Sequence, residues 1–177
     1  MKLNKIMLAV VMAMGVSSFA ANAVDAGHGK VTFKGSIIDA PCSIDPDSID
    51  QTVQLGQISN VALKDGGSSS PKNFEIRLEN CTLSTAKTVT TTFTGAKGVN
   101  GLGITGTAKG ASIVITDGKG AAIELGKATD AQGIQDGKNT LSFSAYLKGD
   151  GKTAAGATID VVPGDFTGIA DFTLAYL

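Results

Sequence analysis

The chain has 177 residues and nearly balanced charge, with 15 Lys and Arg residues against 16 Asp and Glu residues and one histidine. This balance excludes the strongly basic surface of a nucleic-acid-binding protein. One histidine cannot by itself build a metal site or a catalytic triad. The length is enough for one domain with a modest core.

The N-terminal segment 1–23 has the pattern of a secretory signal peptide. Lys2 and Lys5 precede an apolar run at 6–14, and Ala21-Asn22-Ala23 matches a small-residue cleavage site. We therefore expect cleavage before Val24 and export of the mature chain. A retained anchor is the alternative, but the apolar run is too short to span a bilayer as a helix.

The mature N-terminus combines a flexible start with a strand pattern. In "VDAGHGKVTFKG", Val31 and Phe33 alternate with polar residues (Lys30, Thr32 and Lys34). The apolar phase then changes at 37–38, from Gly29, Val31, Phe33, Gly35 and Ile37 to Ile38, Ala40 and Cys42. A change of one residue turns side chains to the other face. Our hypothesis is that the segment before the change belongs to a different sheet or a different molecule; an ordinary first strand of the same molecule is the alternative.

The two cysteines, Cys42 and Cys81, both lie in the part expected to be exported. An oxidising compartment favours one disulfide between them. Two buried free thiols or a metal-binding pair are the alternatives, but there is no C-x-x-C motif and no histidine to support a metal. Closing a loop of this length stabilises a fold by about 4 kcal/mol on the chain-entropy model.

Short runs with period-two alternation follow along the chain. They are separated by Asp-Gly pairs at 65–66, 117–118, 136–137 and 150–151, which favour tight turns. The stretch "SIVITDGKGAAIEL" predicts a hairpin around 117–120, and "KDGGSSSPKN" predicts a surface loop inside the domain. The alternating runs are "KVTFKG", "FEIRLEN", "TVTTTF" and "TLSFSAYL". Such spacing is typical of an antiparallel β-sandwich.

The closing stretch "GIADFTLAYL" is a well-patterned strand. One face carries apolar residues (Ala170, Phe172, Leu174 and Tyr176), and the other carries Asp171, Thr173 and Ala175. Nothing after it would cover its open edge. An exposed apolar edge strand invites another strand to pair with it.

Other motifs are weak. "GLGITG" at 101–106 matches G-x-G-x-x-G, but no helix-forming segment follows as dinucleotide binding requires. Asn80-Cys81-Thr82 matches a glycosylation sequon, and His28 lies on a flexible terminus where solvation is its ordinary role. We find no nucleophile motif or metal cluster. We therefore expect no enzyme activity, no cofactor, no metal and no small-molecule substrate.

Four stretches together resemble a known family: "GKVTFKGSIIDAPCSI", "FEIRLENC", "DGKNTLSFSAYL" and "PGDFTGIADFTLAYL". They are similar to chaperone–usher pilus subunits, and most similar to the major subunits of P-pilus-like and mannose-resistant Proteus-like fimbriae. The ending is the most specific part. Gly164 stands fourteenth from the C-terminus, Tyr176 is penultimate, and the positions between them alternate.

The resemblance implies an all-β, incomplete immunoglobulin-like sandwich that lacks its seventh strand. A periplasmic chaperone fills the resulting groove first, and the N-terminal extension of the next subunit fills it in the fibre. This is donor-strand complementation. The implied partners are identical subunits joined head to tail, the chaperone and an outer-membrane usher, in a fimbria on the cell surface that supports adhesion.

The resemblance also assigns residues. Residues 24–34 are the donor extension, with Gly29, Val31 and Phe33 as its inserting positions, and residues 35–177 are the pilin domain. The groove edge, which is also the chaperone-binding strand, comprises Gly164, Phe166, Ala170, Phe172, Leu174 and Tyr176. Two other functions stay open at this point: a tip or adaptor adhesin or other carbohydrate-binding sandwich, and a secreted β-sandwich enzyme such as a metal-dependent dismutase.

Overall fold

A computed structural model describes residues 27–153 and 156–177 of the chain. The expected signal peptide and Val24 lie outside the described residues. The chain divides after Ile37 into two compact units.

Residues 27–37, the described part of the first unit, form neither helix nor strand. The side chains with the strand pattern are open to solvent: Val31 is 75% exposed and Phe33 is 90% exposed. The alternative that these residues form an ordinary first strand of their own chain is therefore not what the structure contains.

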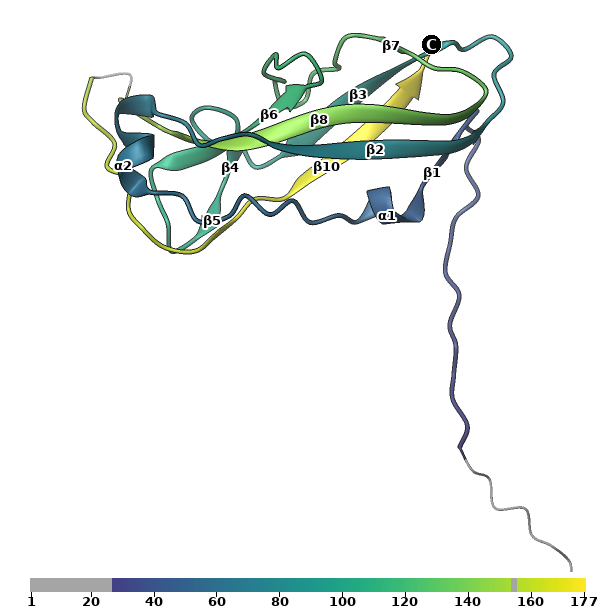
Figure 1. Cartoon of the computed structure of the whole chain (residues 1–177), viewed down its shortest axis with the longest axis horizontal. Coiled ribbons are helices and arrows are strands. Elements are labelled where there is room, and N and C mark those ends of the chain that lie inside the picture. The colour runs from purple at the N-terminus through teal and green to yellow at the C-terminus, as the bar shows by residue number, and fades with distance from the viewer. Residues whose placement is uncertain (1–26, 154–155) are drawn as a thin grey trace, which may run out of the picture. The chain divides into compact units, whose positions relative to one another are not determined.

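The second unit, Ile38–Leu177, is a sandwich of short antiparallel strands (Figure 1). One sheet has the order β1-β2-β8-β6-β4, a second has the order β10-β3-β7, and β5 pairs with β9. The strands are β1 (Ser43–Ile44), β2 (Lys72–Cys81), β3 (Thr88–Gly95), β4 (Leu102–Gly103), β5 (Thr105–Gly106), β6 (Ala111–Asp117), β7 (Gln132–Gly133), β8 (Gly137–Gly149), β9 (Phe166–Thr167) and β10 (Ala170–Tyr176). The expected all-β sandwich is confirmed.

The core lies between the two sheets and follows the alternation of the sequence. On β2, β3 and β8, every second side chain is fully buried; these residues include Ile76, Leu78, Val89, Leu141 and Phe143. From Lys72 to Leu78, β2 keeps one register with β8, in which Phe74 lies opposite Phe143 and Ile76 opposite Leu141. The register shifts between Leu78 and Cys81. Period-two sequences bury one face of a strand in this way.

Three short helical turns interrupt the strands: α1 (Pro46–Ile49), α2 (Asn60–Leu63) and η1 (Lys64–Gly66). Asp45 caps α1, because its carboxylate accepts the backbone N–H of Asp47 at 2.9 Å and Pro46 occupies the first turn. η1 lies in the expected surface loop, before β2 begins at Lys72.

The expected hairpin after β6 is present. Asp117 accepts the backbone N–H groups of Lys119 and Ala121, at 2.9 and 2.8 Å, and holds the turn. The return arm is short: Ile123 donates its backbone N–H to Ile115 at 2.8 Å.

The closing segment differs from the sequence expectation in one respect. We expected Phe166 to belong to the last strand. It lies instead in β9, opposite Gly106 of β5. The break follows from packing, since a Cβ on Gly168 would lie 2.5 Å from the Cδ1 of Ile113. The chain passes close to the core here and resumes as β10 only at Ala170.

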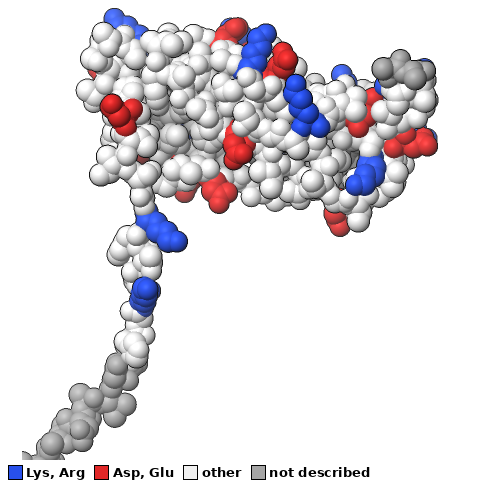
Figure 2. Space-filling model, turned by 180° about the vertical axis from the view of Figure 1, so that it is seen from behind, with Lys and Arg blue, Asp and Glu red and all other residues white. Residues whose placement is uncertain are grey.

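Charged side chains of both signs are interspersed on the face shown in Figure 2, with no patch of a single sign over the sandwich. Among the described residues, no helix is long and apolar enough to cross a membrane.

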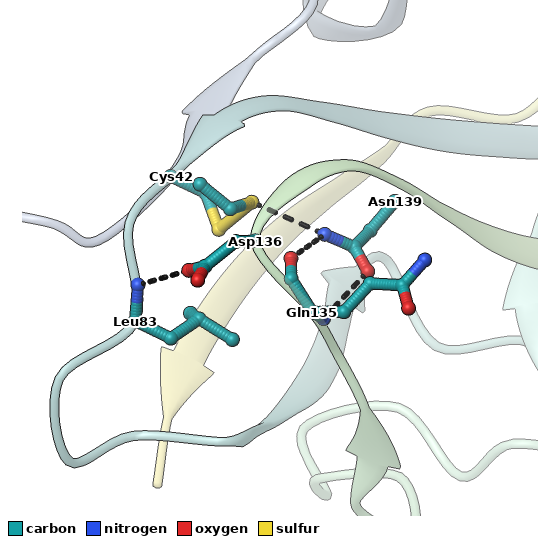
Figure 3. Close-up of a disulfide and its surroundings, with 6 residues drawn as sticks. Cys42, Leu83, Gln135, Asp136 and Asn139 are labelled. Atoms are coloured by element: carbon teal, nitrogen blue, oxygen red, sulfur yellow. Dashed lines mark hydrogen bonds between the residues drawn. A yellow bond between two sulfur atoms is a disulfide. The ribbon is translucent and has the colours of Figure 1, made fainter.

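Cys42 and Cys81 form a disulfide, so the sequence prediction is confirmed (Figure 3). Both residues are buried, at 3% and 4% exposure. Hydrogen bonds tie the turn before β8 to the disulfide. Asn139 donates its side-chain amide to the Cys81 Sγ at 3.3 Å and to the Gln135 carbonyl at 2.7 Å. Asp136 accepts the Leu83 backbone N–H at 2.7 Å. The bridge thus joins the start of the domain to the end of β2 and the start of β8.

We expect the Cys42→Ser, Cys81→Ser double variant to lose about 4 kcal/mol of unfolding free energy, because the unfolded chain regains the freedom of the opened loop. Urea unfolding of the oxidised protein and the double variant measures the difference. Equal midpoints and slopes would contradict a stabilising role for the bridge.

Candidate functional site: an open apolar groove

β10 is an edge strand with an unfinished face. It pairs with β3 along its whole length, from Ala170 opposite Gly95 to Tyr176 opposite Val89, and has no strand on its other side within the described chain. An edge strand leaves a row of backbone N–H and C=O groups unpaired. Its inward side chains are only half-buried, whereas Val89 and Thr91 on β3 are fully buried. The core is therefore closed at β3 and open at β10.

The segment after α1 runs beside the same opening. Residues 52–57 belong to no helix or strand, and no backbone–backbone hydrogen bond joins them to another described residue. Val53 and Leu55 are half-buried while Thr52 and Gln54 are exposed, which is strand-like alternation without a strand partner. We call residues 48–58 the groove wall.

Side chains fasten the start of the groove wall to β2. The buried Ser48 Oγ accepts the backbone N–H of Arg77 at 3.0 Å. Gln51 donates its side-chain amide to the Glu75 carbonyl at 3.1 Å, and the Arg77 guanidinium binds the Asp45 carboxylate at 2.9 Å. These contacts hold the wall in place without a backbone ladder.

A groove of about 1190 Å³ lies between these boundaries. It is lined by the groove wall, by residues 161–169, by the beginning of β10 and by inward side chains of β4, β6 and β8. Of the predicted edge residues, Gly164, Phe166, Ala170 and Phe172 line it. Leu174 and Tyr176 do not line it, but they lie half-buried on the same face of β10 and pack on the core.

Aromatic rings form part of the groove floor. Phe74, Phe93 and Phe172 line the groove, and Phe143 is buried beneath them. Phe93 meets Phe143 edge to face at 5.1 Å between ring centroids and lies 6.4 Å from Phe172. Such a floor buries apolar side chains favourably and has no hydrogen-bonding groups of its own.

Gly164 lies in the lining segment for a packing reason. A Cβ at this position would lie 2.6 Å from the backbone nitrogen of Ala108. The next residue, Asp165, donates its N–H to the Thr107 Oγ1 at 3.0 Å and accepts the backbone N–H groups of Thr107 and Ala108. Glycine thus allows two backbones to come together at this end of the groove.

The predicted donor positions, Gly29, Val31 and Phe33, lie in the first unit and are exposed. The groove wall and the aromatic floor were not identified from sequence. The alternation of Val53 and Leu55 in "TVQL" was a usable signal for the wall. The neighbouring glutamines and Gly56 weaken it.

The structure shows where the weaker motifs lie. The "GLGITG" stretch contains β4 and β5 and no strand–turn–helix unit. Asn80 of the sequon directly precedes the disulfide-bonded Cys81. Among the described residues, no group of three or more His, Cys, Asp or Glu side chains could hold a metal ion.

The surroundings of Asp45 and Tyr176 shift the pKa values of both side chains. The Arg77 guanidinium holds the pKa of the Asp45 carboxyl below its ordinary value of 3.8, chiefly by hydrogen bonding, and the backbone N–H of Asp47 acts in the same direction. Burial raises the pKa of the Tyr176 hydroxyl on the face of β10.

The lowered pKa of Asp45 predicts a pH dependence. The stability that this carboxylate supplies is fully present above the unfolded-state pKa and is lost as the pH falls through the lower folded-state value. We expect Asp45→Asn to be less stable than the native chain at pH 7, and the difference to shrink as the pH falls below about 4. Denaturant midpoints of both chains across this range test it; a difference that is constant with pH would contradict it.

The family model "Fimbrial protein" matches residues 31–177. Curated relatives align over nearly full length. The chain is 65% identical to the fimbria A protein of Serratia marcescens, over 99% of each chain. It is 54% identical to the major MR/P fimbria protein of Proteus mirabilis strain HI4320, again over 99% of each.

Two solved structures share the fold. One is a crystal structure of the P pilus rod subunit PapA, with a TM-score of 0.68 and 31% identity, covering 78% of this chain and 100% of that one. The other is a chaperone–usher pilus structure concerned with rod uncoiling, with a TM-score of 0.74 and 34% identity, covering 89% and 100%.

Proposed function

Because the chain belongs to the family of fimbrial proteins, we propose that it is a structural pilus subunit that polymerises by donating its N-terminal extension to the groove of the next copy. The fold is the incomplete immunoglobulin-like sandwich of chaperone–usher pilins. Fimbriae of this kind are assembled on the cell surface from subunits exported through the periplasm.

The observation that carries the proposal is that one chain has both an open apolar groove and an exposed segment with the sequence pattern of a strand. The domain has an apolar groove beside a strand that is hydrogen-bonded on one side only. The same chain has an extended segment whose two large apolar side chains are exposed. Strand addition at a sheet edge uses main-chain hydrogen bonds for affinity and alternate side chains for register.

The energetics favour a lasting contact. Burying Val31 and Phe33 is worth about 3–6 kcal/mol together, at about 1.5–3 kcal/mol for each side chain. The main chain of the donor would add hydrogen bonds to the open edge of β10. Residues 52–57, which also line the groove, have no backbone–backbone hydrogen bonds to other described residues. Gly29, two positions before Val31 and in phase with it, needs no space for a Cβ.

The geometry of such a contact is heterologous, since the donor and the acceptor are different parts of the chain. Heterologous contacts that do not close into a ring produce filaments. This agrees with a function as the repeating unit of a fibre.

We propose two further partners, a chaperone and an usher, and we propose that the protein is not an enzyme. Before assembly, a periplasmic chaperone would cover the groove by pairing with β10, and an outer-membrane usher would bring the subunits together. An open groove of this kind exposes aggregation-prone edge structure and needs such cover. We also propose that the protein has no catalytic activity and takes no cofactor or small-molecule substrate.

We expect the Val31→Asn, Phe33→Asn double variant to abolish polymerisation, because polar amides would then have to enter the apolar groove without partners. Thr32→Asn is the matched control, since its side chain points away from the groove in the same donor. Electron microscopy of cells and light scattering of purified chain measure the yield. Normal fibres from the double variant would refute the donor assignment.

We expect Phe172→Asp to remove most of the subunit from the periplasm, because a carboxylate on the groove face of β10 disrupts the surface that the chaperone covers. Thr173→Asp places the same charge on the outward face of the same strand and should accumulate normally. Immunoblots of periplasmic extracts compare the two. Equal levels would argue against the chaperone-binding role of β10.

A further inference from the structure

The apolar groove has an acidic rim. Three exposed aspartates line it: Asp50 at the end of α1, Asp165 before β9, and Asp171 on β10. None of the three forms an ion pair with another described residue. The one basic residue in the lining is Lys109, whose ammonium already donates to the Gly106 carbonyl at 3.1 Å. We call Asp50, Asp165 and Asp171 the acidic rim.

The N-terminal extension has the opposite charge. Residues 24–34, the donor extension, contain two lysines, Lys30 and Lys34, and one acidic residue, Asp25. In Figure 2 the part of the N-terminal stretch that is not grey carries blue side chains and no red ones. Both lysines are exposed, and both are out of phase with Val31 and Phe33. Lys30 and Lys34 have the same parity as Thr32, so a strand that inserts Val31 and Phe33 into the groove points both lysines outward. Asp171 is exposed on the corresponding outward face of β10.

We propose that Lys30 and Lys34 of one subunit are recognised by the acidic rim of the next, and that this contact guides the donor into the groove and selects a basic donor. The inference rests on the proposed function, because its occupant is the N-terminal extension of a second copy of this chain. The apolar side chains hold the bound donor, and the charges act on its approach.

The two lysines are well separated along the donor. Lys30 and Lys34 lie four residues apart, about 13 Å along an extended strand. At this spacing the two ammonium groups would meet separate aspartates instead of sharing one. The two positive charges match the excess of acidic over basic groups in the lining.

The expected effect is on rate more than on affinity. Exposed ion pairs add little to binding strength and are screened by salt. Complementary charge nevertheless accelerates association and disfavours wrong partners. A donor with acidic outward positions would thus be slow to enter this groove even with apolar side chains that fit.

The test is the initial rate of assembly of purified processed chain, diluted from denaturant and followed by light scattering. At an ionic strength of about 0.01 M, we expect Lys30→Glu, Lys34→Glu to assemble about tenfold more slowly than native chain. At about 1 M, where the Debye length is about 3 Å, the two rates should converge. The matched control is Lys87→Glu, Lys119→Glu, which changes two exposed lysines outside the extension and the groove and should retain the native rate.

A charge swap makes the test specific. Adding Asp50→Lys, Asp171→Lys to the Lys30→Glu, Lys34→Glu chain should restore most of the lost rate at low salt. The proposal is overturned if the lysine variant assembles as fast as its control, or if the swap restores nothing. It is also overturned if the charge-sensitive step is independent of protein concentration, because the lysines would then act on the groove of their own chain.

The outcomes separate this proposal from the proposed function. If the Val31→Asn, Phe33→Asn chain assembles normally, donor-strand polymerisation fails and this inference fails with it. If that chain does not assemble while the lysine variant matches its control, the donor mechanism stands and recognition by the acidic rim alone is refuted.

Discussion

The central feature of the structure is the open edge of β10. This strand is hydrogen-bonded to a neighbouring strand on one side only, and its apolar face is only half-buried. Its register with β3 is continuous over all seven residues, so the strand itself is well formed. What is missing is a neighbour on the other side. A sandwich normally closes its core with strands on both inner faces. Here the core opens into a groove beside β10, which we propose is filled by a strand from another copy.

The remaining features keep that opening in shape. The disulfide between Cys42 and Cys81 closes a loop that contains the whole groove wall, and so limits how far the wall can move. Ser48 and Gln51 bind the wall to β2 through side-chain contacts, and Asp45, three residues before the wall, binds Arg77 of β2. The aromatic floor is fixed from below by the buried ring of Phe143. A preformed site loses less entropy when its occupant arrives.

Sequence alone predicted the features that depend on local alternation. The face of β10 follows from Ala170, Phe172, Leu174 and Tyr176, and the disulfide follows from two cysteines in an exported chain. The separation of Phe166 from β10 did not follow, because it depends on the close approach of Gly168 to Ile113 from a distant strand. The anchoring of the groove wall by Arg77 was equally invisible, since its partners lie far away in sequence.

The N-terminal extension is a second feature that the sequence of one chain predicts only in part. The phase change at 37–38 coincides with the boundary between the two units, and the assignment of Val31 and Phe33 to another molecule stays a prediction. Which molecule receives them is a matter of assembly. The acidic rim became apparent only when three aspartates from separate parts of the chain lined one groove.

The most direct measurement is a cryo-electron microscopy map of filaments assembled from the native chain, at a resolution that shows side chains. The account predicts that residues 29–34 of one subunit lie beside β10 of its neighbour, with the Val31 and Phe33 side chains in the groove. A groove filled by the subunit's own extension, or left open within the filament, would contradict it.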